Sequence, residues 1–170
     1  GGTYASGTVV TMTANPAAHY HFVDWTGSVT GSVNPTTVTM DADKSVTANF
    51  ALDTYTLTYS AGTGGTISGT TPQTVSYGGS GTQVTAVPDA HYHFVSWSDG
   101  VLTASRTETN VTADVTVTAS FALDQHTLTT GVDPVGGGTV TGGGTYDPGT
   151  VVSLGARRDP GLRCACWTGG

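Results

Sequence analysis

Charge is what this sequence has least of. Only 10% of the 170 residues are charged, five of them Lys or Arg and twelve Asp or Glu, and the formal net charge is −7. Binding to nucleic acid or to an anionic membrane surface needs clustered cations, and the sequence contains no such cluster. No apolar run approaches the roughly 20 residues that cross a bilayer. We therefore expect neither a nucleic-acid partner nor membrane insertion.

Cysteine is nearly absent, and so are the signals of helices. Cys164 and Cys166, close to one end, are the two cysteines. A long cysteine-free stretch with few lysines suits an exported bacterial protein that does not depend on disulfides, although many cytosolic chains share it. No stretch combines a 3.6-residue apolar period with helix caps, so a helix is at most one short turn. Abundant Gly, Thr, Val and Tyr instead favour short strands joined by tight turns.

Internal repetition is the strongest pattern in the chain. SVTANFALDTYTLT at residues 45–58 aligns with TVTASFALDQHTLT at 116–129, an offset of 71 residues. GTVVTMTANPAAHYHFVDWTG at residues 7–27 aligns with GTVVSLGARRDPGLRCACWTG at 149–169, an offset of 142. The offsets divide the chain into three parts. These are a partial repeat without its N-terminal strands (1–53), a complete repeat (54–124) and a partial repeat without its C-terminal strands (125–170).

Strand-like alternation fills the complete repeat. YTLTYS at 55–60 and VTVTASFAL at 115–123 place apolar residues on one face and threonines on the other. Gly-rich and Pro-containing separators between such stretches predict turns. We therefore predict tandem, mainly antiparallel β modules of about 70 residues. Their predicted core residues are Phe22, Trp25, Phe50, Leu57, Phe94, Trp97, Phe121, Leu128 and Trp167.

The order YTLT, GGTISG, GTQVTAVP, YHFVSW and VTASFA in the complete repeat resembles the divergent InlB B-repeat family, which occurs in tandem on large secreted and surface proteins of bacteria. The resemblance covers the whole chain and implies an extracellular or cell-surface spacer or adhesion-associated module without enzymatic activity. The related InlB B-repeats have a compact β-grasp-like fold, so a mixed α+β fold is an alternative. His19 and His91 occupy the position of the family's usual glycine before the tyrosine.

The histidine pairs raise the question of a metal site. His19 with His21, and His91 with His93, are two apart on predicted strands, which is a start toward a zinc or copper site that needs three or four ligands. A third ligand in the first copy, Asp24, is replaced by serine in the second copy, and the third copy has no histidine at either position. We therefore predict no metal, no cofactor and no catalytic residues, and we expect these histidines to flank a packed strand.

The tryptophans allow two interpretations. Exposed rings at Trp25, Trp97 and Trp167 would form a platform for sugars, but one tryptophan per repeat is what a small module needs as its largest core residue. We favour the core. Cys164 aligns with Phe22 and is interpreted as a small buried hydrophobe, because a lone C-x-C pair is a weak metal signal.

The leading hypothesis is a structural one, a stalk or spacer in a bacterial extracellular or cell-surface protein whose partners are neighbouring repeats. An alternative is an adhesin that binds a host or matrix ligand through the loops at 26–37 and 98–110, which differ most between copies. Arg106 and Glu108 are its candidate ligand contacts. A third hypothesis is a self-assembling extracellular fibre, in which unpaired strand edges accept a strand from another copy.

Overall fold

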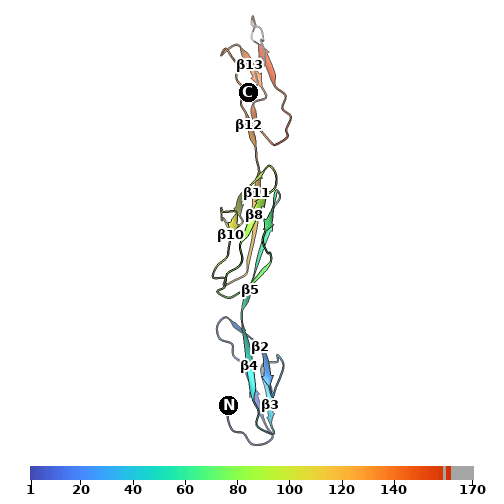
Figure 1. Cartoon of the computed structure of the whole chain (residues 1–170), viewed down its shortest axis with the longest axis vertical. Helices are drawn as coiled ribbons and strands as arrows, with labels where there is room; N and C mark the ends of the chain where they lie inside the picture. The colour runs from blue at the N-terminus through green and yellow to red at the C-terminus, as the bar shows by residue number, and fades with distance from the viewer. Residues whose placement is uncertain (159, 162–170) are drawn as a thin grey trace. The chain divides into compact units, whose positions relative to one another are not determined.

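The computed structural model describes residues 1–158, 160 and 161, and its regular elements are all strands (Figure 1). They are β1 (Thr8–Met12), β2 (Tyr20–Gly27), β3 (Thr36–Met40), β4 (Val46–Leu52), β5 (Thr54–Ala61), β6 (Gly65–Ser68), β7 (Gln73–Ser76), β8 (Val84–Pro88), β9 (Tyr92–Trp97), β10 (Ser105–Arg106), β11 (Val115–Leu123), β12 (His126–Leu128), β13 (Gly138–Thr141), β14 (Gly144–Tyr146) and β15 (Gly155–Arg158). The predicted fold class is confirmed, and the described part contains no helix of the kind that a β-grasp fold requires. No helix there is long and apolar enough to cross a membrane.

The chain divides into two compact units, and both of them draw on the complete repeat. The first unit comprises residues 1–59, 69–85 and 105–117, and it contains the antiparallel pairs β1–β3, β2–β4, β5–β7 and β8–β10. The second unit comprises residues 60–68, 86–104 and 118–170, and it contains the antiparallel pairs β9–β11, β12–β14 and β13–β15.

The complete repeat forms two sheets. One has the strand order β7-β5-β11-β9 and the other has the order β10-β8-β6. Alternation along each strand decides which side chains are buried. In β5, Leu57 is fully buried and Tyr59 nearly so, whereas Thr58 between them is half-buried and Thr56 and Ser60 on either side are exposed. The buried side chains of this repeat are Leu57, Tyr59, Gln73, Val75, Val84, Ala86, Trp97, Val111, Val117 and Ala119. Its strands thus follow the predicted pattern of apolar and hydroxyl faces.

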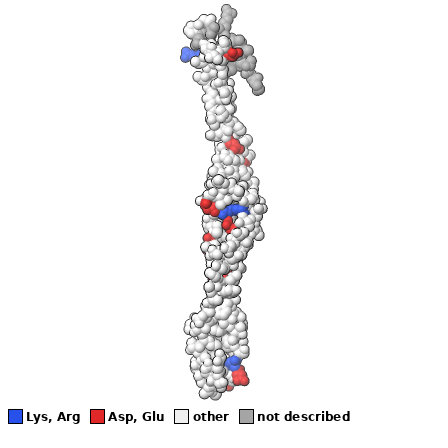
Figure 2. Space-filling view, turned by 90° about the vertical axis from the view of Figure 1, so that its left-hand side faces the viewer, with Lys and Arg blue, Asp and Glu red and all other residues white. Residues whose placement is uncertain are grey.

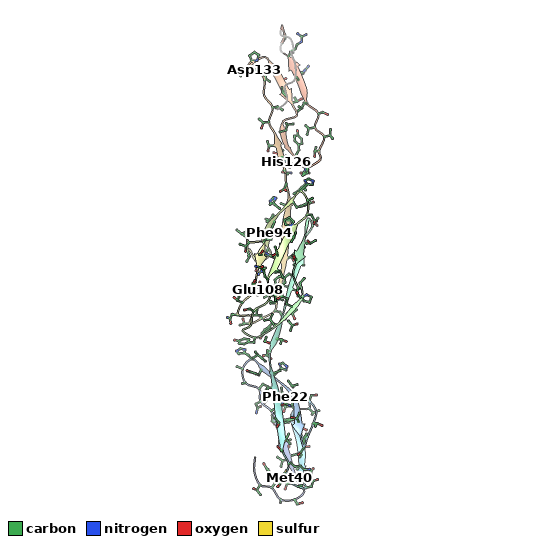
Figure 3. The ribbon with its side chains drawn as sticks, in the orientation of Figure 1. Phe22, Met40, Phe94, Glu108, His126 and Asp133 are labelled. Carbon is green, nitrogen blue, oxygen red and sulfur yellow. The ribbon has the colours of Figure 1, made fainter. Side chains whose placement is uncertain are left out.

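Aromatic rings recur in the same arrangement in two copies. The ring centroids of Phe22 and Phe50 lie 6.0 Å apart at 73°, and those of Phe94 and Phe121 lie 6.1 Å apart at 75°. Figure 3 marks Phe22 and Phe94, which occupy corresponding strands β2 and β9. Edge-to-face pairs of this kind add to the stabilisation that ring burial provides. The repeat in sequence is therefore also a repeat of core geometry.

Phe50 departs from the predicted core, because 40% of its surface is exposed. In the complete repeat, Gly65 of β6 lies so close to the ring of Phe121, the counterpart of Phe50, that an added Cβ would overlap the ring. The described first copy has no counterpart of β6 over Phe50. Phe22, Phe94, Phe121 and Leu128 are half-buried. Trp167, Cys164 and Cys166 lie outside the described residues.

Candidate functional site

The end of each repeat is the place where the recurring polar side chains meet. Asp53 is the single residue between β4 and β5, and Asp124 with Gln125 separates β11 from β12. Each aspartate is the last residue of a FALD sequence, at 50–53 and at 121–124, and the two sequences are 71 residues apart. We call these two places the first joint (Asp53 and the residues bonded to it) and the second joint (Asp124 and the residues bonded to it). Neither contains the Gly- or Ser-rich linker that would let consecutive strands move freely.

At the first joint, Asp53 is held through all three of its polar groups. Its carboxylate Oδ1 lies 3.0 Å from Nδ1 of His21. Its backbone N–H donates to the carbonyl of His19 at 2.8 Å, and its own carbonyl accepts the N–H of Tyr77 at 2.8 Å. The first two partners belong to β2 and the turn before it, whereas Tyr77 follows β7 of the next repeat. Asp53 therefore connects groups from both sides of the joint.

His19 has a left-handed backbone, a conformation that glycine adopts without the cost of a Cβ. Its φ is 66°, a conformation that costs an L-residue with a Cβ about 1–2 kcal/mol. This backbone turns its carbonyl toward the Asp53 amide, and the imidazole stacks on the ring of Tyr77 with centroids 3.6 Å apart and planes 8° apart. Stacking offsets part of the backbone cost.

The second joint repeats this chemistry with its own residues. Nδ1 of His93 lies 2.7 Å from Oδ1 of Asp124, whose N–H donates to the carbonyl of His91 at 2.7 Å. His91 has a φ of 68°. On the far side, the side-chain amide of Gln125 donates to the carboxylate of Asp147 at 2.8 Å. The same donor and acceptor atoms thus recur at two separate places in the chain.

His21 and His93 each bind a carboxylate rather than forming part of a cluster of metal ligands. Among residues 1–158, 160 and 161, no three His, Cys, Asp or Glu side chains lie close enough to hold an ion. The strand pattern predicts that the histidines lie beside a packed strand, but it does not indicate their aspartate partners. Asp53 is 32 residues from His21, and Asp124 is 31 residues from His93. A signal was available, because HYHF and FALD recur together in the first two copies.

Trp25 and Trp97 are core residues that also hold the loops that vary between copies. Trp25 is 6% exposed, and its indole N–H donates to the carbonyl of Val33 at 2.9 Å. Trp97 is 1% exposed and donates to the carbonyl of Thr103 at 3.0 Å. Neither ring presents an open face to a sugar. Each instead fixes the following loop to the framework through its indole N–H and its backbone amide, which donates to the carbonyl of Gly31 or Val101.

Arg106 and Glu108, the predicted ligand contacts, bind each other. Nε of Arg106 donates to Oε1 of Glu108 at 2.8 Å and a terminal nitrogen does so at 2.6 Å, while only 8% of the arginine side chain is exposed. The guanidinium lies 6.0 Å from the ring centroid of Tyr59. Burial, and then the charge of Glu108, raise the pKa of Tyr59. Glu108 is labelled in Figure 3. Figure 2 shows that charged side chains are sparse on the face of the molecule that is turned to the viewer there.

A profile of the divergent InlB B-repeat domain matches residues 1–54, 55–125 and 128–170. The chain belongs to this family. InlB B-repeats of this type are typical of bacterial surface proteins and are generally not catalytic. Comparisons with curated proteins and with solved structures find no match. The joints, the anchored loops and the aromatic cores are therefore properties of a tandem InlB B-repeat chain.

Proposed function

We propose that this InlB B-repeat chain acts as a stalk or spacer of a bacterial extracellular or cell-surface protein. The observation that carries the proposal is the first joint, where one residue separates the strands of two repeats. That residue, Asp53, is bonded through its amide, its carbonyl and its carboxylate. A stalk needs joints that transmit position from one repeat to the next, and a single, fully bonded residue supplies little free rotation.

The surface and the strand lengths fit this role. The exposed positions of β5 and β11 are mostly threonine and serine, which keep a sheet hydrated without charge. β11 has nine residues, and at about 3.3 Å per residue it spans about 30 Å. Each added repeat would extend the reach of a terminal domain by a few tens of Å. Length would then be set by copy number, and a ligand site in each repeat would be unnecessary.

Distance distributions between spin labels test the proposal. We would label Val33→Cys and Leu102→Cys, whose native side chains are 71% and 76% exposed, in a chain with Cys164→Ser and Cys166→Ser. A spacer predicts one narrow distribution. The matched control inserts Gly-Ser-Gly-Ser-Gly-Ser after Asp53, which should broaden the distribution. If the parent is as broad as this control, the first joint does not transmit position and the stalk proposal fails.

An adhesin is the second candidate, and one observation favours it. Val33 and Leu102 lie in the loops fixed by Trp25 and Trp97, and both side chains are largely exposed. Variable loops on a rigid framework commonly carry binding. Leu102→Asp should abolish binding of the chain to a host or matrix ligand, with Arg106→Ala as a comparison. Unchanged binding by Leu102→Asp would show that the loop at 98–110 does not contact the ligand. The fibre hypothesis stays a prediction, which light scattering of the purified chain tests.

A further inference from the structure

We propose that the His21–Asp53 and His93–Asp124 pairs are pH-dependent latches, which close each repeat end more firmly when the imidazole is protonated. Each pair joins the same atoms, Nδ1 and Oδ1, at 3.0 and 2.7 Å. The inference depends on the geometry of the joints alone, so it holds whether the chain is a stalk or an adhesin.

The chemistry of the pair makes acidity the controlling variable. Histidine is the side chain whose charge ordinarily changes between pH 5 and 8, a range in which aspartate stays ionised. Side chains of His21 and His93 are 55% and 58% exposed, so protons reach them without opening the fold. A neutral imidazole carries its proton on one nitrogen or the other, whereas the protonated ring always donates from Nδ1. The charged hydrogen bond is the stronger one.

Closure of the latch bears directly on the backbone of the joint. The aspartate that receives the imidazole also donates its N–H to the carbonyl of His19 or His91, at 2.8 and 2.7 Å. A firmer hold on the carboxylate therefore also keeps this backbone hydrogen bond formed. At the first joint the same residue accepts the N–H of Tyr77, so the effect extends to the following repeat.

Other titratable groups among the described residues lie beside the latches. At the first joint they are His19, which stacks on Tyr77, and Tyr55, whose ring centroid is 6.4 Å from that of Tyr77. At the second joint they are His91, Tyr92 opposite Leu123, His126 of β12 with Tyr146 opposite it, and Asp147, which accepts a hydrogen bond from Gln125. Tyrosine is ordinarily neutral below pH 9. The first latch therefore has one other histidine close to it in sequence, His19, and the second has two, His91 and His126. A control variant must address all three residues.

The third copy of the sequence points to the same chemistry. Arg163 aligns with His21 and His93, so the position has a basic side chain in all three copies. Arginine remains charged at every pH of interest. His→Arg is therefore the natural reference substitution, because it keeps a basic side chain whose charge does not depend on pH.

Amide hydrogen exchange of the full chain at pH 5.5 and 7.5 tests the proposal. Protection factors, corrected for the intrinsic pH dependence of exchange, are compared at the Asp53 and Asp124 amides. We expect protection in the wild type to be several-fold greater at pH 5.5. H21Q/H93Q should show low protection at both pH values, and H21R/H93R high protection at both. The Ala86 amide, bonded to the Ala104 carbonyl within the second unit, is the internal reference.

Two outcomes would overturn the latch. One is equal protection of both amides at the two pH values in the wild type. The other is a pH dependence that persists in H21Q/H93Q, which would assign it to another group. H19N/H91N/H126Q separates the neighbouring histidines, because asparagine tolerates the left-handed backbone at the first two positions and His126 is exposed. This variant should keep the pH dependence of the wild type. All of these positions are exposed or tolerant of the new residue, so each variant should fold.

Discussion

Replacing Trp97 with alanine is the sharpest test of the core. The side chain is 1% exposed and its ring lies 6.1 Å from that of Phe94. Truncation of a buried tryptophan to alanine costs about 3–5 kcal/mol. Loss of the indole N–H that the Thr103 carbonyl accepts adds about 1 kcal/mol. The total of about 4–6 kcal/mol compares with about 4–11 kcal/mol for a domain of 71 residues, the length matched from 55 to 125.

We therefore expect Trp97→Ala to unfold the complete repeat or leave it marginal at 25 °C. Hydrogen exchange measured by mass spectrometry assigns protection to each repeat, which tryptophan fluorescence with three tryptophans does not. Peptides from residues 55–125 should lose most of their protection. Trp97→Phe is the matched control, because it keeps most of the apolar volume and removes the indole donor, and it should cost about 1–3 kcal/mol. Wild-type protection of 55–125 in Trp97→Ala would refute a core role for this ring.

Three further predictions concern single positions. Gly65→Ala should destabilise the chain by about 1–3 kcal/mol in urea unfolding, because the new methyl overlaps the Phe121 ring; an unchanged midpoint would show that the ring moves aside freely. Burial, followed by the charge of Glu108, raises the pKa of Tyr59, so the stability that neutral Tyr59 contributes is complete below about pH 10 and is lost as pH rises further. Thermal melts from pH 9 to 11.5 should therefore fall more steeply in the wild type than in Tyr59→Phe, and parallel curves would contradict this. His91→Gly removes a left-handed backbone cost and should raise stability by up to about 1 kcal/mol, whereas a lower melting temperature would mean that the imidazole itself stabilises the turn.

Much of the fold could be predicted because it depends on local pattern. The alternation of YTLTYS predicts a strand with Leu57 buried, and the structure buries this residue completely. Internal repetition predicts that Trp25 and Trp97 are equivalent core residues, and both are buried. These features need only the period of a strand and the self-similarity of the chain.

Features that depend on pairing across the chain were not predictable in the same way. The partner of His21 is 32 residues away, and nothing in a strand pattern indicates which carboxylate will lie beside it. Phe50 and Phe121 have the same local sequence but different surroundings, since Gly65 of β6 lies against only the second ring. Equal sequence therefore predicts equal strands, while burial is decided by what the rest of the chain places over them.

The two joints show why a repeat chain retains polar residues at its ends. A hydrophobic contact between repeats would be non-directional and would also attract other chains. Asp53 and Asp124 instead accept and donate hydrogen bonds along fixed directions, and the left-handed His19 and His91 turn their carbonyls to meet them. The unfavourable left-handed conformation of the two histidines thus places the carbonyls that accept the Asp53 and Asp124 amides. The same directional bonds recur at both joints, whereas the loops that follow Trp25 and Trp97 differ in sequence between the copies.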